Sequence, residues 1–258
     1  MADMKKLLCL CATLVAPPAF ALDLDTIVSA EILPGWRQPD GTHVAALRID
    51  LAPGWKTYWR APGDAGIPPQ IDLSGSEGIR SMQSYWPTPE VFETSGLRSV
   101  GYHDSVVVPI ELTGDETMLL KGEAFIGVCD DICIPAVLSF EAELTSGGTR
   151  DGAIMASLMD QPITLNDQPV CKIAPLSDGL QVTFTMPPSV PQNADVVIEA
   201  QDGIWVSDPV TWQEGGTLMA RSDMLGPDAG PFALDRSQVR VTLLGAGQAV
   251  EMLGCVGG

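Results

Sequence analysis

The strongest constraint on the fold of this chain is a strict alternation of apolar and polar side chains in several short runs. The clearest runs cover residues 43–51, 136–144, 180–186 and 239–243. Alternation with a period of two predicts β-strands that bury one face and leave the other face to water. The chain also has 26 Gly and 21 Pro, enough to supply the many turns of antiparallel sheets. The sequence therefore predicts an all-β fold.

One segment has a helical pattern instead. Four apolar residues recur at helical spacing within residues 154–159, Asp151 precedes them as a candidate N-cap, and Pro162 follows their end. The polar, glycine-containing stretch TSGGTR comes just before this segment. We expect a short helix here, inside a linker between two folded units.

The predicted domain organisation follows from this linker. We assign residues 1–21 to a signal peptide, 22–148 to a first domain, 149–162 to the linker and 163–258 to a second domain. Each domain has the size and patterning of an immunoglobulin-like β-sandwich. A single larger sandwich or barrel is the alternative.

The N-terminus has the layout of a secretory signal peptide. Lys5 and Lys6 precede a short apolar run, and Ala19-Phe20-Ala21 fits a cleavage site. The apolar run is too short to cross a membrane. We therefore expect an exported, periplasmic protein. Its formal net charge of −19 argues against nucleic acid and anionic lipid as partners, since both attract basic surfaces.

Four cysteines follow the predicted signal peptide: Cys129, Cys133, Cys171 and Cys255. An oxidising compartment favours disulfides, and four cysteines allow three connectivities. Cys171 lies near the start of the second predicted domain and Cys255 near its end, where first and last strands often run close together. A bond between them would close a long loop and add on the order of 4 kcal/mol of stability. We interpret this pair as a structural disulfide, with a second redox couple as the alternative.

Cys129 and Cys133 flank the turn Asp130-Asp131-Ile132 between two predicted strands. Residues that face each other across such a turn have Cα atoms roughly 4.5–5.5 Å apart, within reach of a disulfide. The closed loop is very short, so the bond would stabilise the fold little, and a redox role is the better interpretation. The two carboxylates disfavour the thiolate, which predicts an electron-donating couple.

Metal binding and a purely structural disulfide are the alternatives to a redox role for this cysteine pair. Zinc needs two further ligands nearby, but the only histidines are His43 and His103, and the sequence contains no second close pair of Cys or His. A purely structural hairpin disulfide and a copper site both stay open. The alternative function is therefore a non-enzymatic copper-handling or binding module.

Three segments in series resemble one known family. They are GWKTYWRAPGDAGIPP (residues 54–69), YWPTPEVFETSGLRSVGYHDSVVVPIEL (residues 85–112) and CDDICIP (residues 129–135). Together they are similar to the N-terminal periplasmic domain of the thiol:disulfide interchange protein DsbD and to ScsB-type domains. The resemblance implies an immunoglobulin-like fold that carries the active cysteines on a hairpin.

The resemblance also implies residue roles and partners. Cys129 and Cys133 take the redox positions, Phe92 takes the place of the cap aromatic that shields them, and Tyr102 is our candidate for lining the site. The expected activity is that of a protein-disulfide reductase or electron relay without a cofactor. Electrons would come from a separate membrane-embedded donor of the DsbD/CcdA type, because the chain ends at Gly258 without the family's membrane and thioredoxin domains. They would pass to periplasmic thioredoxin-fold proteins.

Overall fold

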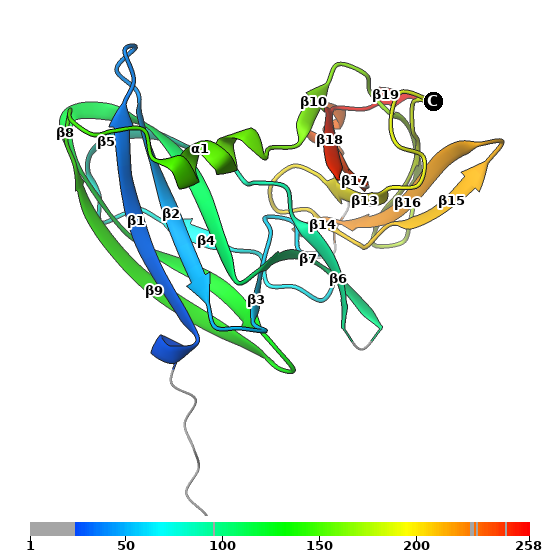
Figure 1. Ribbon diagram of the computed structural model, residues 1–258. Helices are drawn as coiled ribbons and strands as arrows, with labels where there is room; N and C mark the ends of the chain where they lie inside the picture. Colours follow the sequence, from blue (N-terminus) through cyan, green and yellow to red (C-terminus); the bar gives the residue numbers. More distant parts are fainter. Residues whose placement is uncertain (1–23, 95, 228–229, 231, 246) are drawn as a thin grey trace, which may run out of the picture.

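A computed structural model describes residues 24–258, except residues 95, 228–229, 231 and 246. The predicted signal peptide, residues 1–21, lies outside the described residues. The described chain is mostly β, as the sequence predicts. Its strands form two groups, which we call the N-terminal part (residues 24–144) and the C-terminal part (residues 163–257), and α1 (Gly152–Met159) lies between them in the sequence (Figure 1).

The N-terminal part is one nine-stranded sheet that opens with a short 3-10 helix, η1 (Leu24–Thr26). The sheet order is β1-β2-β8-β3-β7-β6, and β4, β5 and β9 also pair with β8. β8 is 25 residues long, which lets it pair with several strands along its length. The strands are β1 (Val28–Arg37), β2 (His43–Leu51), β3 (Lys56–Tyr58), β4 (Gln70–Asp72), β5 (Glu77–Ser84), β6 (Glu90–Thr94), β7 (Leu97–His103), β8 (Ser105–Cys129) and β9 (Cys133–Leu144).

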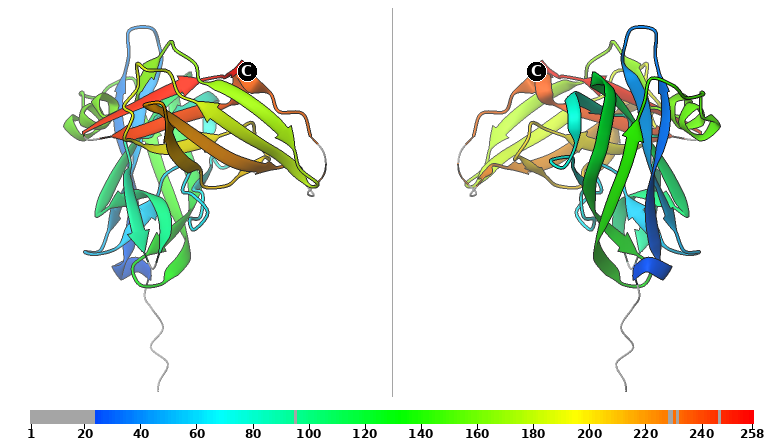
Figure 2. Two further views of the ribbon diagram at one scale, coloured as in Figure 1. Left: turned by 90° about the vertical axis from the view of Figure 1, so that its right-hand side faces the viewer. Right: turned by 90° about the vertical axis from the view of Figure 1, so that its left-hand side faces the viewer.

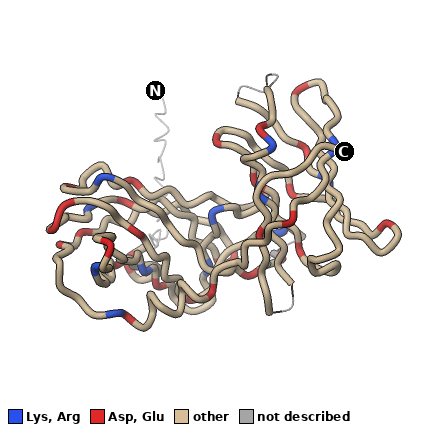
Figure 3. The backbone as a smooth tube through the Cα atoms, turned by 90° about the horizontal axis from the view of Figure 1, so that it is seen from above, with Lys and Arg blue, Asp and Glu red and all other residues tan. Residues whose placement is uncertain are grey.

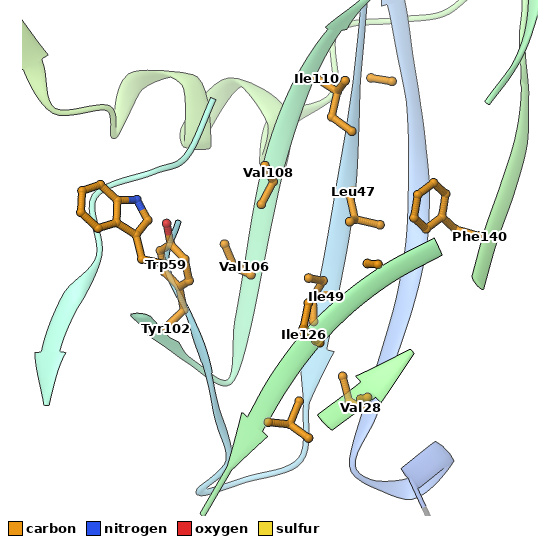
Figure 4. Close-up of a cluster of buried hydrophobic side chains, with 14 of the residues drawn as sticks. Val28, Leu47, Ile49, Trp59, Tyr102, Val106, Val108, Ile110, Ile126 and Phe140 are labelled. Carbon is orange, nitrogen blue, oxygen red and sulfur yellow. The ribbon is translucent and has the colours of Figure 1, made fainter. Parts of the chain in front are cut away.

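The sheet encloses an apolar core built from alternate residues of its strands. Leu47 and Ile49 of β2 meet Ile110 and Ile126 of β8 there, and all four are at most 2% exposed. Trp59 and Tyr102 lie at one end of this cluster and Phe140 of β9 at the other (Figure 4). The alternation in residues 43–51 therefore does direct one face of β2 into a core.

The face of β2 that the sequence predicts to be open to water is open at Arg48 and Asp50, whose side chains are 41% and 39% exposed, but it is covered at its other end. Val44 and Ala46 are buried against Ile154 of α1, together with Trp36. Ser157 of α1 donates a hydrogen bond to the Val107 carbonyl oxygen at 2.6 Å. The helix thus covers apolar side chains that would otherwise be exposed.

The helix begins where the sequence predicts. The Asp151 carboxylate accepts hydrogen bonds from the Ala153 and Ile154 amides at 2.8 and 3.1 Å, an N-cap that satisfies free backbone donors of the first turn. Because α1 packs on the N-terminal part, it does more than connect two segments. Its role as a linker between two domains stays a prediction.

The C-terminal part contains a four-stranded sheet, β10-β18-β17-β13, and a six-stranded sheet, β14-β16-β12-β11-β19 with β15 beside β16. The 3-10 helix η3 (Arg236–Gln238) precedes β17. The strands are β10 (Ile163–Leu165), β11 (Val170–Pro175), β12 (Gly179–Thr185), β13 (Asp195–Glu199), β14 (Trp205–Val206), β15 (Val210–Glu214), β16 (Thr217–Leu225), β17 (Arg240–Gly245), β18 (Gln248–Leu253) and β19 (Val256–Gly257).

The two parts touch through side chains. Among the described residues, strands pair only within their own part. Val197, Leu244 and Ala249 of the C-terminal part nevertheless belong to the same buried cluster as the N-terminal core. Figure 2 shows the two groups of strands side by side in both views. The division into two independently folded domains stays a prediction.

Acidic side chains are spread over both parts (Figure 3), as the net charge of −19 requires. Within the described ranges, we find no helix with the length and apolar character needed to cross a membrane.

Candidate redox site

The proposed redox cysteines face each other across the β8–β9 turn. The strand register pairs Cys129 with Cys133, and their Cα atoms are 4.2 Å apart. The two residues form a disulfide. The Asp130 amide donates to the Ile132 carbonyl oxygen at 3.1 Å, which closes the turn. The predicted juxtaposition of these cysteines is confirmed.

The two sulfurs lie in different surroundings. Cys129 is fully buried, because it ends a central strand and pairs with Lys56 of β3 on its other side. Cys133 is exposed at the start of β9, which pairs with β8. An incoming thiolate can therefore reach the Cys133 sulfur directly, while the Cys129 sulfur is suited to be the leaving group.

Tyr58 brings a hydroxyl group to both sulfurs. Its oxygen lies 2.9 Å from Cys129 Sγ and 3.2 Å from Cys133 Sγ. A disulfide carries no hydrogen, so the hydroxyl is the donor in this state. Burial raises the pKa of Tyr58 above its ordinary value, so the hydroxyl stays protonated and able to donate at neutral pH.

The position of the Tyr58 ring depends on glycine. A Cβ atom on Gly127 would lie 2.8 Å from Tyr58 Cε2, too close for any real contact. Gly127 is on β8, two residues before Cys129, so the ring packs closely on the strand that carries the buried sulfur. The Thr57 hydroxyl donates to the Gly127 carbonyl oxygen at 2.9 Å and fixes β3 at this position.

A pocket of about 180 Å³ opens beside Cys133. Lys56 lines it with its ammonium group 5.2 Å from the centre of the Phe92 ring. Asp130 and Asp131 are exposed at its rim. Lys56 is buried, so its charge is screened less by water than those of the two carboxylates. The pocket is lined by Lys56, Tyr58, Ala65, Leu97, Ser99, Asp130, Asp131 and Cys133.

Neither of the two residues proposed to shield the cysteines is among the residues that line the pocket beside Cys133. Phe92 is on β6, 8% exposed, with its ring 4.3 Å from the His103 ring in an edge-on arrangement. The same β6–β7 hairpin presents Leu97 and Ser99 to the pocket. Tyr102 is buried, and its hydroxyl donates to the Pro87 carbonyl oxygen at 2.8 Å. The shielding roles of Phe92 and Tyr102 stay predictions, and Leu97 is a cap candidate that sequence reasoning missed.

The second cysteine pair lies in the C-terminal part. Cys171 and Cys255 form a disulfide with Cα atoms 5.7 Å apart, and both residues are buried. Cys171 is on β11, which pairs in parallel with β19 directly after Cys255. The first and last strands of this sheet thus do run close together. The structural role of this pair stays a prediction.

The histidines lie apart from the disulfide. His43 is buried, 2.6 Å from the Pro34 carbonyl oxygen, and His103 pairs with Glu90 at 3.1 Å. Across the described part of the chain, no group of three or more His, Cys, Asp or Glu side chains is arranged to hold a metal ion.

A β-fold that presents one exposed and one buried sulfur of a hairpin disulfide is a fold suited to thiol:disulfide interchange. Residues 29–144 match the family model "Thiol:disulfide interchange protein DsbD, N-terminal". This match confirms the resemblance drawn from the sequence: residues 29–144 are similar to the N-terminal domain of DsbD.

Solved structures agree on the fold. The chain is similar to the N-terminal periplasmic domain of ScsB from Proteus mirabilis, with a TM-score of 0.62 and 21% identity over 89% of this chain and 92% of that chain. A marsupial T cell receptor matches over 89% of this chain and 60% of that chain at 8% identity, but its TM-score of 0.19 does not indicate a shared fold. No curated protein sequence matches the chain significantly.

Proposed function

We propose that this protein is a thiol:disulfide reductant or electron relay that works through the Cys129–Cys133 couple. The observation that carries the proposal is the asymmetry of the disulfide: Cys133 is exposed, and Cys129 is buried against the Tyr58 hydroxyl at 2.9 Å. The family match and the cysteine pair support thiol:disulfide interchange as the class of activity.

In the donating direction the Cys133 thiolate attacks a client disulfide. One client sulfur leaves as a thiolate, and a mixed disulfide joins Cys133 to the other. Cys129 then attacks Cys133 Sγ, which releases the second client sulfur and forms the Cys129–Cys133 bond. Two electrons pass to the client, whose two sulfurs take up the two protons that the cysteines lose.

In the recharging direction a donor thiolate attacks Cys133 Sγ, and Cys129 leaves as a thiolate. The Tyr58 hydroxyl is already within hydrogen-bonding distance of that sulfur, and a hydrogen bond to a charged acceptor is stronger than one to a neutral acceptor. Tyr58 therefore stabilises the leaving group as its charge develops. A second donor thiolate then resolves the mixed disulfide.

The direction of electron flow depends on a balance of charges. Asp130 and Asp131 disfavour the thiolates and so make the dithiol a better electron donor. The buried ammonium of Lys56 and the Tyr58 hydroxyl act in the opposite sense. The proposed donating direction therefore rests on the two carboxylates of the turn, and the less screened Lys56 charge and the Tyr58 hydroxyl reduce their effect.

We assign the protein to the periplasm, after export by the signal peptide of residues 1–21. The DsbD family supports, in general terms, a membrane-embedded electron donor and thioredoxin-like clients. The exposed position of Cys133 fits clients that are themselves proteins, since a bulky partner can reach only an accessible sulfur.

Transfer to a purified periplasmic thioredoxin-fold protein in its disulfide form tests the proposal. The reduced wild-type chain should reduce this protein, and Cys129→Ser/Cys133→Ser should not. Cys129→Ser keeps the exposed thiol and should accumulate a mixed disulfide with the client. Cys133→Ser keeps only the buried thiol and should not.

Circular dichroism and thermal unfolding of each variant provide the control, because the hairpin bond contributes little to the fold. Undiminished transfer by the correctly folded double variant would rule the function out. Equal trapping by the two single variants would show that the sulfurs are not distinguished by their exposure.

A further inference from the structure

The segment of residues 60–68, which follows β3, contributes Ala65 to the lining of the redox pocket. The Ala65 carbonyl oxygen lies 3.4 Å from the Tyr58 hydroxyl. A Cβ atom on Gly66 would lie 3.0 Å from the Tyr58 ring, so the backbone of this segment packs directly on that ring. The position of the segment therefore sets the position of the hydroxyl that contacts the sulfurs.

Asp208 of the C-terminal part holds this segment. Its amide donates to the Asp64 carboxylate at 3.0 Å, and the Asp64 amide lies 3.4 Å from the Asp208 carboxylate as a reciprocal donor. A Cβ atom on Gly63 would lie 2.9 Å from Asp208 Oδ1, which shows how closely the two loops approach. The contact ties the loop between β14 and β15 to the segment that supports Tyr58.

The Asp208 carboxylate also contacts β7, the strand that contributes Leu97 and Ser99 to the pocket. Arg98 of β7 donates to Asp208 Oδ1 at 3.0 Å and to the Val196 carbonyl oxygen at 3.1 Å. Arg98 lies between Leu97 and Ser99, both of which line the pocket. Asp208 thus contacts both the segment that contributes Ala65 to the redox pocket and the strand that contributes Leu97 and Ser99 to it.

A second ionic contact supports this junction. Arg60 donates to Glu199 from Nε and Nη2 at 3.0 Å each, and to Glu251 from Nη2 at 2.5 Å. Its guanidinium lies 4.1 Å from the Trp59 ring centre. These three charged side chains are 11–22% exposed, so the ion pairs are shielded from water more than surface pairs are. The junction is therefore held at two places along one segment.

We propose that Asp208 is a positioning residue for exchange at the Cys129–Cys133 disulfide, acting through residues 63–66 on Tyr58. The inference rests on the proposed function of that disulfide. It gives the C-terminal part a role in the reaction, because its loop keeps the Tyr58 hydroxyl against the sulfur that leaves.

The rate at which dithiothreitol reduces the Cys129–Cys133 bond tests this role. Asp208→Ala should slow the reduction by about threefold to tenfold. Each factor of ten in rate corresponds to about 1.4 kcal/mol of activation free energy. In a Tyr58→Phe background the same substitution should have no further effect, since the hydroxyl that it positions is gone. Asp178→Ala removes another carboxylate of the C-terminal part, one that bonds locally to Ser177 at 3.4 Å, and should leave the rate unchanged.

Asp208→Asn keeps the shape of the side chain and serves as the second variant where Asp208→Ala does not fold. Asp208→Asn should slow the reduction by a smaller factor than Asp208→Ala, and again only when the Tyr58 hydroxyl is present. An unchanged rate in folded Asp208 variants, or an equal slowing with and without the Tyr58 hydroxyl, overturns the positioning role. A wild-type disulfide that does not exchange at all would instead overturn the proposed function.

Discussion

The two disulfides within residues 24–258 connect cysteines of very different separation in very different surroundings. Cys129 and Cys133 are separated by 4 positions, and one of their sulfurs is exposed at the tip of a hairpin. Cys171 and Cys255 are separated by 84 positions, and both residues are buried where the first and last strands of a sheet meet. Partners can thus reach the Cys129–Cys133 bond in the folded protein, whereas the Cys171–Cys255 bond becomes accessible only on unfolding.

Loop length should produce the largest difference between the two bonds. The entropy model assigns on the order of 4 kcal/mol to a loop as long as that of Cys171–Cys255, and about half of this at most to the hairpin loop. Cys171→Ala/Cys255→Ala should therefore lower the free energy of unfolding by about 4 kcal/mol. Cys129→Ala/Cys133→Ala is the matched control and should lower it by about half as much or less. Urea denaturation of both variants measures the difference, and equal losses would remove the distinction between the bonds.

Accessibility should produce the next largest difference. A thiol can attack Cys133 in the native state, whereas attack on Cys171–Cys255 requires a local opening of the C-terminal part. We expect dithiothreitol to reduce the hairpin bond at least about 100-fold faster, equivalent to ~2.7 kcal/mol. Alkylation followed by mass spectrometry reports which cysteines are free at each time. Simultaneous labelling of all four cysteines without denaturant would contradict this prediction.

The Tyr58 hydroxyl should have a smaller effect on the rate at which the Cys129–Cys133 bond is reduced. Tyr58→Phe removes the group 2.9 Å from Cys129 Sγ and leaves the ring in place. Hydrogen bonds to charged groups contribute about 1.5–3 kcal/mol, and Tyr58 already donates to the neutral disulfide, so we expect the lower end of this range and a reduction by dithiothreitol that is about tenfold slower. Reduction of Cys171–Cys255 in the unfolded chain should not change. Tyr85→Phe is the matched control, since that hydroxyl donates to Glu111 at 3.0 Å.

The sequence predicted the parts of this comparison that depend on local pattern. Alternation located β2 within residues 43–51, the short turn placed Cys129 opposite Cys133, and Asp151 marked the start of α1. Each of these features is decided by residues a few positions apart. The same is true of the β-class of the fold, which repeats one short pattern.

The groups around the disulfide depend on pairings between distant strands, which one sequence does not reveal. Tyr58 is 3% exposed, and nothing in its sequence neighbourhood distinguishes it from an ordinary core residue. Its contact with the sulfurs exists only because β3 pairs with β8 at Lys56 and Cys129, 73 positions apart by their numbers. The expectation that one face of β2 is open to water holds for Arg48 and Asp50, but α1, more than a hundred residues away in the chain, covers Val44 and Ala46 of that face. The alternation of Lys56 and Tyr58 in β3 was the one local signal that these side chains share a face.

The smallest predicted effect is a loss of stability in acid. It should distinguish the N-terminal part from the C-terminal part, not one disulfide from the other. His43 is 1% exposed, and burial lowers its pKa, with the Arg37 cation acting in the same direction. Above the ordinary pKa of 6.5 the residue is neutral in both states, so its contribution is complete. Below it, the unfolded chain takes up a proton that the folded chain does not, and stability falls until the pH passes the folded pKa.

Hydrogen exchange at pH 7.5 and pH 5.5 can resolve this loss, which we expect to reach about 1 kcal/mol for amides of β2. Amides of β12 and β16 should keep their opening free energies, because both histidines of the sequence, His43 and His103, lie in the N-terminal part. His43→Gln should remove the pH response, and His103→Gln should keep it. If β2 still loses protection in His43→Gln, the response comes from carboxylates, and acid does not distinguish the two parts through this residue.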